Sequence, residues 1–172
     1  MKQLNFQTFN MIKYVQGDLF SEFETGQYDA MMHQANCQGV MGAGVAKFIA
    51  TKYPDAAKAD KKSFYENEFL YGDYSYCETE FGKVVNLYGQ FYMGPCLPDP
   101  LSMDSYQNRI AHLGKAFRKA VEELKLKSVV IPLMASGIAA DPVYMGSGTS
   151  LEYFKNFVEF ALNGCDITVV YQ

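Results

Sequence analysis

The chain has 172 residues, of which 49% are hydrophobic and 20% are charged, and its formal net charge at pH 7 is −4. These values fit one compact globular domain over residues 1–172, and they exclude a disordered chain and a small disulfide-stapled scaffold. An acidic chain is also unlike the basic proteins that bind nucleic acid nonspecifically, so we expect no direct nucleic-acid binding.

The first part of the chain predicts two strands. Residues 1–10 hold one lysine and no apolar stretch, so we expect no secretory signal. No apolar run anywhere reaches the ~18–20 residues of a membrane span, so we expect no membrane association. Residues 11–15 alternate apolar and polar side chains before Gly17 and Asp18, which predicts a strand that ends in a turn. Residues 28–35 predict a second short strand.

From residue 42 onward the apolar residues recur with a helical period. Residues 42–53 predict a helix with an apolar face that stops at Pro54, and residues 55–67 predict a second, charged helix. The pattern then becomes β-like, and residues 74–80 and 83–88 predict two strands joined as a hairpin.

The second half of the chain continues the alternation of helices and strands. Residues 93–101 hold three prolines and a glycine and predict a loop, whereas residues 103–126 have the clearest helical periodicity of the chain. The apolar run at residues 128–133 predicts a strand that is buried on both faces. The remaining predicted elements are a loop at 141–149, a helix at 151–162 and a final strand at 167–171. Together these elements predict a layered α/β domain with a mixed sheet.

Cysteine usage indicates the compartment. The chain contains Cys37, Cys77, Cys96 and Cys165, which form no C-x-x-C pair, and it has only two histidines. We therefore expect no structural zinc site. Without a secretory signal, four free thiols predict a reducing, cytoplasmic location.

Glycine and other small residues gather in two loops that directly follow predicted strands, at residues 39–44 and 135–140. Loops at the carboxyl ends of strands are where open α/β sheets bind ligands, and small residues let the backbone approach a phosphate. The first loop reads G-x-x-G-x-G, which is neither the dinucleotide fingerprint nor a P-loop. Each loop could equally be an ordinary tight turn.

Three motifs, in their order along the chain, carry a family resemblance. They are G-D-L at residues 17–19, N-C-Q-G-V-M-G-A-G-V-A at residues 36–46, and P-L-M-A-S-G-I at residues 132–138. The chain resembles a macrodomain from about residue 11 to residue 171. It looks most similar to the branch of ADP-ribose 1″-phosphate phosphatases, through the H-x-x-N-C-x-G stretch from His33 and the N-L-Y-G-Q segment from Asn86.

The resemblance implies a three-layer α/β/α macrodomain with a mixed, mostly parallel central sheet. It also implies a pocket for ADP-ribose or ADP-ribose 1″-phosphate at the carboxyl edge of that sheet. Asp18 would accept a hydrogen bond from the adenine amino group, or it simply caps a following turn. Asn36 would bind the distal ribose, or its side chain shapes the loop. The ligand-binding residues implied in this way are Asp18, Leu19, Asn36, Gly42, Ala43, Gly44, Val45, Ser136, Gly137, Ile138, Ala139, Ala140 and Tyr144.

The catalytic residues implied by the resemblance are His33, Asn36 and Asp141. His33 would serve as base or acid near neutral pH, although a lone histidine on a strand is more often a core residue. Ester-cleaving relatives with a lysine nucleophile have it in the segment that matches residues 87–90, where our alignment puts Gly89. We therefore expect no lysine adduct. We expect neither a metal nor another cofactor.

These expectations lead to one favoured function and two alternatives. We expect a monomer that hydrolyses ADP-ribose 1″-phosphate to ADP-ribose and phosphate. The first alternative is a module that only binds ADP-ribose. The second is a hydrolase that removes ADP-ribose from a modified macromolecule, against which the acidic charge argues mildly if the macromolecule is a nucleic acid.

Overall fold

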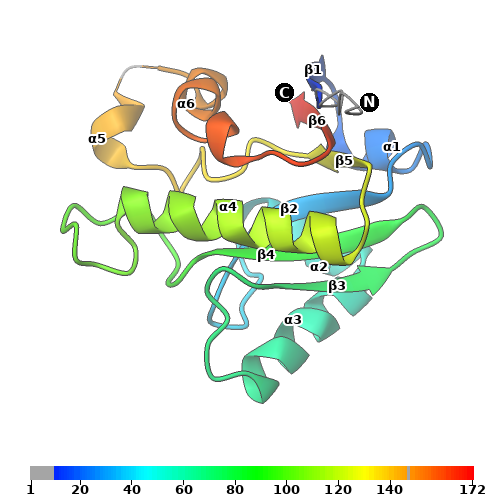
Figure 1. The fold of residues 1–172 in the computed structure, drawn as a ribbon, viewed down its shortest axis with the longest axis horizontal. Coiled ribbons are helices and arrows are strands. Elements are labelled where there is room, and N and C mark those ends of the chain that lie inside the picture. The colour runs from blue at the N-terminus through cyan, green and yellow to red at the C-terminus, as the bar shows by residue number, and fades with distance from the viewer. Residues whose placement is uncertain (1–9, 147) are drawn as a thin grey trace, which may run out of the picture.

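A computed structural model describes residues 10–146 and 148–172, and within them the strands form one six-stranded sheet (Figure 1). The prediction of no secretory signal concerns residues 1–10. Of these, only Asn10 belongs to the described part of the chain. The strands are β1 (Ile12–Gln16), β2 (Ala30–Asn36), β3 (Tyr74–Glu78), β4 (Lys83–Gln90), β5 (Ser128–Ile131) and β6 (Asp166–Tyr171). Their order is β1-β6-β5-β2-β4-β3, and every neighbouring pair is parallel except β3–β4. The predicted mixed, mostly parallel sheet is confirmed.

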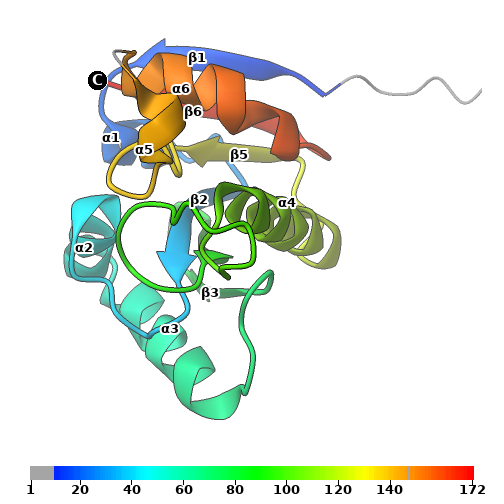
Figure 2. The same ribbon diagram turned by 90° about the vertical axis from the view of Figure 1, so that its left-hand side faces the viewer.

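Helices cover both faces of this sheet, which gives three layers (Figure 2). On one face lie α1, α2 and α3, and on the other lie α4 and α6. The helical elements are α1 (Leu19–Phe23), α2 (Gly44–Lys52), α3 (Pro54–Glu66), α4 (Tyr106–Glu123), α5 (Pro142–Met145), α6 (Ser150–Phe157) and the 3-10 helix η1 (Glu159–Ala161). None of these helices is both long and apolar enough to cross a membrane.

Alternation along the strands divides the core into two clusters. On β2, Ala30 and Met32 pack with Leu113 of α4, whereas Met31 packs with Ile49 of α2. Successive side chains of a strand point to opposite faces, so a strand between two helical layers must be apolar on both. The continuous apolar run of β5 follows the same rule.

The structure differs from the sequence prediction at three helices. The helix α1 went unpredicted because its five residues are too few to show a helical period. The expected loop at residues 141–149 contains the short helix α5, which Asp141 caps and Pro142 begins. The expected helix at residues 151–162 ends at Phe157 and continues as η1.

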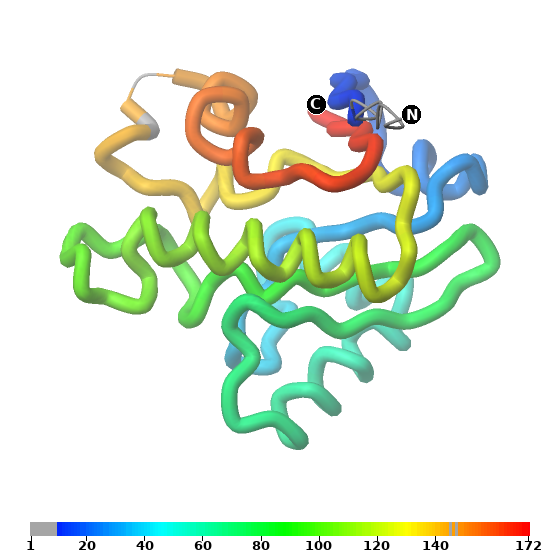
Figure 3. Tube along the Cα trace, viewed as in Figure 1, coloured from blue at the N-terminus to red at the C-terminus, as the bar shows by residue number. Residues whose placement is uncertain are grey.

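The parallel strands all end at one edge of the sheet. Figure 3 shows β1 and β6 side by side, where the first and last strands of the chain pair in parallel. The loops that follow β2, β4 and β5 start from the same edge, because these three strands are parallel neighbours. This arrangement brings the two glycine loops of the sequence together.

Candidate functional site

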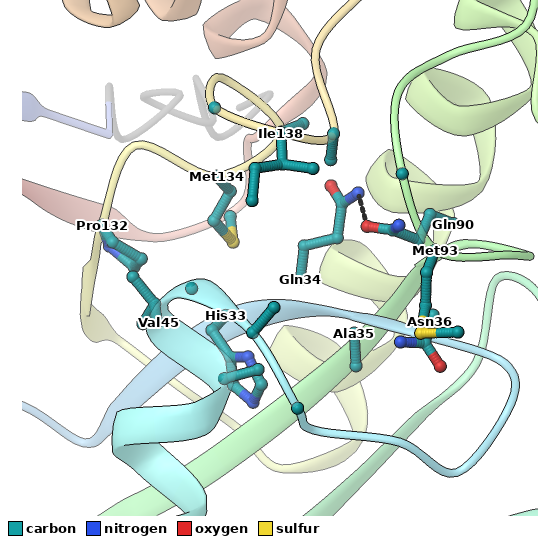
Figure 4. A pocket seen from close by; sticks show the side chains of 18 of the residues that line it. His33, Gln34, Ala35, Asn36, Val45, Gln90, Met93, Pro132, Met134 and Ile138 are labelled. Carbon is teal, nitrogen blue, oxygen red and sulfur yellow. Dashed lines mark hydrogen bonds between the residues drawn. The ribbon is translucent and has the colours of Figure 1, made fainter.

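A cavity of about 560 Å³ opens at the edge of the sheet where β2, β4 and β5 end (Figure 4). This size lies within the ~300–1,000 Å³ of small-molecule sites. Its lining includes these predicted site residues: His33, Asn36, Gly42, Ala43, Gly44, Val45, Gly137, Ile138 and Ala139. The predicted residues that do not line it are Asp18, Leu19, Ser136, Ala140, Asp141 and Tyr144.

The first glycine loop connects β2 to α2. The Asn36 side chain shapes it, because Nδ2 donates to the Val40 carbonyl at 2.9 Å and Oδ1 accepts from the Gln38 amide at 3.0 Å. The helix begins at Gly44, whose φ of 57° favours glycine, and the residue at the N-cap, Ala43, has no capping side chain. The first N–H groups of α2 therefore lack a side-chain acceptor at the cavity wall.

The second loop follows β5. Gly137, Ile138 and Ala139 line the cavity, and Ile138 is 69% exposed. Ser136 is buried instead, where its hydroxyl donates to the Met134 carbonyl at 2.9 Å. Ala140 closes a turn by donating its N–H to the Gly137 carbonyl at 3.1 Å. The exposed part of this loop is thus only its middle.

A third wall, which the sequence did not predict, consists of Gln90 at the end of β4 and of Met93 and Gly94 in the loop that follows. A buried ion pair fixes it: the carboxylate of Asp104 accepts from Arg109 Nε at 2.9 Å, and both side chains are 2% exposed. The same carboxylate accepts from the backbone N–H groups of residues 91 and 92.

Arg109 also joins two walls of the cavity. Its guanidinium donates to the carbonyl of Gly94 at 2.7 Å and to the carbonyl of Ala139 at 3.1 Å. The loop after β4 and the loop after β5 are therefore held by one side chain of α4. The conformation of both walls depends on this buried cation.

His33 points away from the open part of the cavity. Its ring is buried, and Nε2 lies 2.6 Å from Oδ1 of Asn86. Because the Asn86 amide nitrogen donates to Ala56 and Ser75, Oδ1 must accept, so Nε2 carries the proton. Nδ1 is then a lone-pair acceptor without a partner among residues 10–146 and 148–172. Burial lowers the pKa of His33, which keeps the ring neutral at pH 7.

Asp18 and Leu19 lie at the end of β1, outside the cavity lining. Asp18 caps α1 through Oδ2, which accepts from the Ser21 amide and from the Ser21 hydroxyl, both at 2.8 Å. These hydrogen bonds lower the pKa of the exposed Asp18 carboxyl. The Leu19 side chain is buried in the core beside Phe23.

Asp141 and Tyr144 are likewise occupied elsewhere. Asp141 Oδ1 accepts from the Val143 amide at 2.9 Å and so caps α5. The Tyr144 ring stacks on Phe157 with the ring centroids 5.0 Å apart. In this structure neither side chain reaches the ligand space for which it was predicted.

The segment predicted to lack a lysine nucleophile has a different register from the expected one. A side chain at Gly89 would point toward α4, where a Cβ would come within 2.8 Å of Leu113. The residue of this segment that lines the cavity is Gln90. The side-chain amide of Gln90 is not a nucleophilic amine. We therefore still predict no lysine adduct, now because Gln90, and not Gly89, is the residue of this segment that faces the cavity.

The cavity contains no charged side chain among its described lining residues, and its polar side chains are His33, Gln34, Asn36 and Gln90. Across the described part of the chain, no group of three or more histidine, cysteine or acidic residues could hold a metal ion. The four cysteines are free thiols, as predicted. An anionic ligand in this cavity would depend on backbone N–H groups.

Comparison with known proteins identifies related sequences. The sequence model of the family described as Macro domain matches residues 32–146. Two curated relatives are named ADP-ribose 1″-phosphate phosphatase. The one from Lodderomyces elongisporus is 36% identical over 62 residues, and the one from Debaryomyces hansenii is 31% identical over 87 residues. The matches cover 36% and 49% of this chain, and 39% and 41% of those relatives.

Solved structures share the fold over nearly the whole chain. The macrodomain of Thermus aquaticus DarG is similar with a TM-score of 0.66 and 19% identity, covering 95% of this chain and 99% of that one. Thermosipho africanus DarTG, solved in complex with ADP-ribose, has a TM-score of 0.66 and 14% identity, covering 95% of this chain and 42% of that one. At such identities the similarity establishes the fold.

Proposed function

The chain belongs to the Macro domain family, and from this premise we propose that its cavity binds ADP-ribose and that the protein hydrolyses ADP-ribose 1″-phosphate. The observation that carries the binding proposal is a cavity without charged side chains beside the uncapped start of α2. Helix N-termini bind phosphates through their free N–H groups and the positive end of the helix dipole. The diphosphate of ADP-ribose is a ligand of this kind.

The adenine would lie toward β1, where Asp18 offers an acceptor. Both hydrogen bonds that the structure gives this carboxylate use Oδ2, so Oδ1 is available to an exocyclic amino group. Capping of α1 and adenine recognition are therefore compatible roles for one side chain.

His33 supports the hydrolytic part of the proposal. It is the titratable side chain among the described lining residues, and its neutral ring carries an unpaired Nδ1. A neutral imidazole can take a proton from a water that attacks phosphorus, while the bond from phosphorus to the ribose oxygen breaks and the released oxygen takes up a proton from solvent. The two curated relatives carry the name of this activity.

Two observations favour the alternatives. The ring of His33 is 1% exposed, which favours a module that binds ADP-ribose without turnover. The cavity rim carries exposed apolar side chains, such as Ile138 and Met93, which suit a substrate whose ADP-ribose is attached to a macromolecule.

Release of phosphate from ADP-ribose 1″-phosphate in the presence of EDTA tests the proposal. We expect turnover by the wild type, a loss of about 10²–10⁴ in rate for His33→Gln, and nearly unchanged affinity for ADP-ribose. His112→Gln is the matched control, because His112 lies on α4 and its ring stacks on Tyr71 rather than lining the cavity.

The outcomes separate the candidates. Binding of ADP-ribose without turnover by the wild type supports the binding module. Full activity in His33→Gln removes His33 from the mechanism. Activity on ADP-ribosylated macromolecules alone supports the second alternative.

A further inference from the structure

Two glutamine side chains meet inside the cavity. Gln34 of β2 donates through Nε2 to Oε1 of Gln90 at 2.9 Å, and Gln90 at the end of β4 donates through its own Nε2 to the carbonyl of Tyr92 at 2.8 Å (Figure 4). The two amides and the carbonyl form a chain with one free end. That end is Oε1 of Gln34, which has no partner among residues 10–146 and 148–172.

The direction of this chain follows from its anchor. A backbone carbonyl can only accept, so Gln90 must turn its NH₂ toward Tyr92 and its oxygen toward Gln34. Gln34 must then donate to Gln90 and keep its own oxygen free. If either amide were flipped, two oxygens would face each other.

The anchor itself is rigid. The Tyr92 N–H donates to the Asp104 carboxylate at 3.0 Å, and the Tyr92 carbonyl also accepts from Arg109 at 3.3 Å. Both charged side chains are buried. The ion pair behind the third wall therefore determines, through Tyr92 and Gln90, which atom of Gln34 remains free.

A buried acceptor without a donor is costly, so Gln34 Oε1 needs a ligand that donates. A phosphate oxygen does not suit this role, because the diphosphate carries no proton near pH 7 and a terminal phosphate monoester, with a second pKa of about 6, is mostly deprotonated there. Either would place an oxygen without a proton against Oε1. A sugar hydroxyl can donate. In Figure 4, Gln34 points toward the loop that carries Ile138. The Ile138 side chain is 69% exposed, so a ligand that moves it aside to reach Gln34 costs little buried surface.

The position of Gln34 in the sheet indicates which of the two riboses of ADP-ribose would lie beside it. In the strand order β1-β6-β5-β2-β4, the β2 strand is three places from β1, after which Asp18 lies. At a strand spacing of ~4.8 Å this is about 14 Å from the proposed adenine end. The sugar near Gln34 is then the one beyond the diphosphate.

We propose that Gln34 is a specificity-determining residue, whose Oε1 accepts a hydrogen bond from a hydroxyl of the distal ribose. This inference rests on the proposed function. It adds a side-chain contact that distinguishes ADP-ribose from ADP, which carries the same adenosine and diphosphate without the second sugar.

Titration calorimetry with ADP-ribose and with ADP tests the inference. We expect Gln34→Met to weaken ADP-ribose binding about tenfold and to leave ADP binding unchanged, because methionine keeps the length and loses the acceptor. Gln34→Ala, with the same expected pattern, serves if the methionine variant does not fold. Gln38→Met is the matched control, since the Gln38 amide also bonds a carbonyl of the third wall, that of Phe91, but does not line the cavity.

Each other outcome has a clear consequence. Unchanged affinity for ADP-ribose in Gln34→Met overturns the inference, and so does an equal loss for ADP-ribose and ADP. A wild-type protein that binds neither nucleotide contradicts the proposed function instead. Thermal melting checks that the variants are folded. Gln34→Met removes an unpaired buried oxygen but also removes the donor to Gln90 Oε1, so we expect it to melt close to the wild type.

Discussion

His33 and Gln34 are neighbours on β2 whose side chains face opposite layers of the molecule. His33 lies on the face of the sheet that α2 and α3 cover, in a polar network through Asn86, whose amide donates to the Ala56 carbonyl and the Ser75 hydroxyl, both at 3.0 Å. Gln34 enters the cavity beside Gln90. Adjacent residues of a strand point to opposite faces, so the predicted strand at residues 28–35 accounts for this difference. The sequence could not show that His33 has a hydrogen-bonding partner, Asn86, on another strand 53 residues away.

The burial of His33 predicts a pH dependence of stability. An exposed histidine titrates near pH 6.5, and burial lowers the pKa of His33 below that value. As the pH falls below about 6.5, His33 takes up a proton in the unfolded chain but stays neutral in the folded chain. The free energy of unfolding is therefore full above about pH 6.5 and decreases as the pH falls. The melting temperature should fall between about pH 7 and pH 5, and it should fall less in His33→Gln.

Calorimetry of both proteins over this range measures the difference. The buried Asp60 has a raised pKa and acts in the opposite direction, but it is present in both proteins. Parallel curves for the two proteins would show that His33 is not responsible. The low-pH limb of any activity that uses His33 should also lie below the pH 6–7 expected for an exposed imidazole.

Asp18 has an observed role as the N-cap of α1 and a proposed role in binding adenine, and substitutions can distinguish the two. Asp18→Ala should lower stability by about 0.5–2 kcal/mol through loss of the N-cap, and it should weaken ADP-ribose binding about tenfold. Asp18→Ser keeps a capping oxygen and lacks the second carboxylate oxygen. It should recover the stability and not the affinity, as urea unfolding and calorimetric titration would show; recovery of both would assign Asp18 to capping alone.

At the scale of elements, the periodic helices and the apolar strands were predicted within a few residues, because their patterns extend over several turns or over a full strand. The short helices α1 and α5 depend on single capping residues, and both caps are aspartates that the sequence analysis had considered for ligand or catalytic roles. Local capping thus competes with function for the same residue types.

The start of α2 predicts a selective loss of binding in Gly44→Val. The φ of Gly44 is 57°, which costs a branched residue about 1–2 kcal/mol, and the added side chain would project where the ligand phosphates are proposed. Gly26→Val is the matched control, since Gly26 has a φ of 75° and equally open space but lies outside the cavity. Both variants should melt lower by similar amounts. Only Gly44→Val should lose ADP-ribose binding, and normal binding by it would exclude this loop as the phosphate site.

The third wall predicts a large stability effect from α4. Arg109→Met leaves Asp104 as a buried charge without its cation, which should cost about 3–5 kcal/mol in urea unfolding. Arg118→Met, at an exposed position on the same helix, should cost less than about 0.5 kcal/mol. A small effect at Arg109 would mean that the loops after β4 and β5 hold their conformation without it.

At the scale of the whole molecule, a parallel sheet covered on both faces leaves its carboxyl edge as the place where loops gather. The two walls of small residues, at 39–44 and 135–140, could be predicted because small residues after apolar strands are visible in the sequence. The wall held by Asp104 and Arg109 could not be predicted from the sequence. It depends on contacts between the loop after β4 and two side chains, one on α4 and one just before it. The family match covers residues 32–146, and the extension of a single domain to residues 1–172 remains a prediction.

A titration of isotope-labelled protein with ADP-ribose, followed by amide NMR shifts, tests whether the cavity at the ends of β2, β4 and β5 binds this ligand. We predict saturable shifts at the backbone N–H groups of residues 42–46 and 137–139 and at the side-chain amides of Gln34 and Gln90. Residues of β3, on the far edge of the sheet, should not move. An absence of shifts, or shifts confined to residues outside the cavity, would show that ADP-ribose does not bind in this cavity.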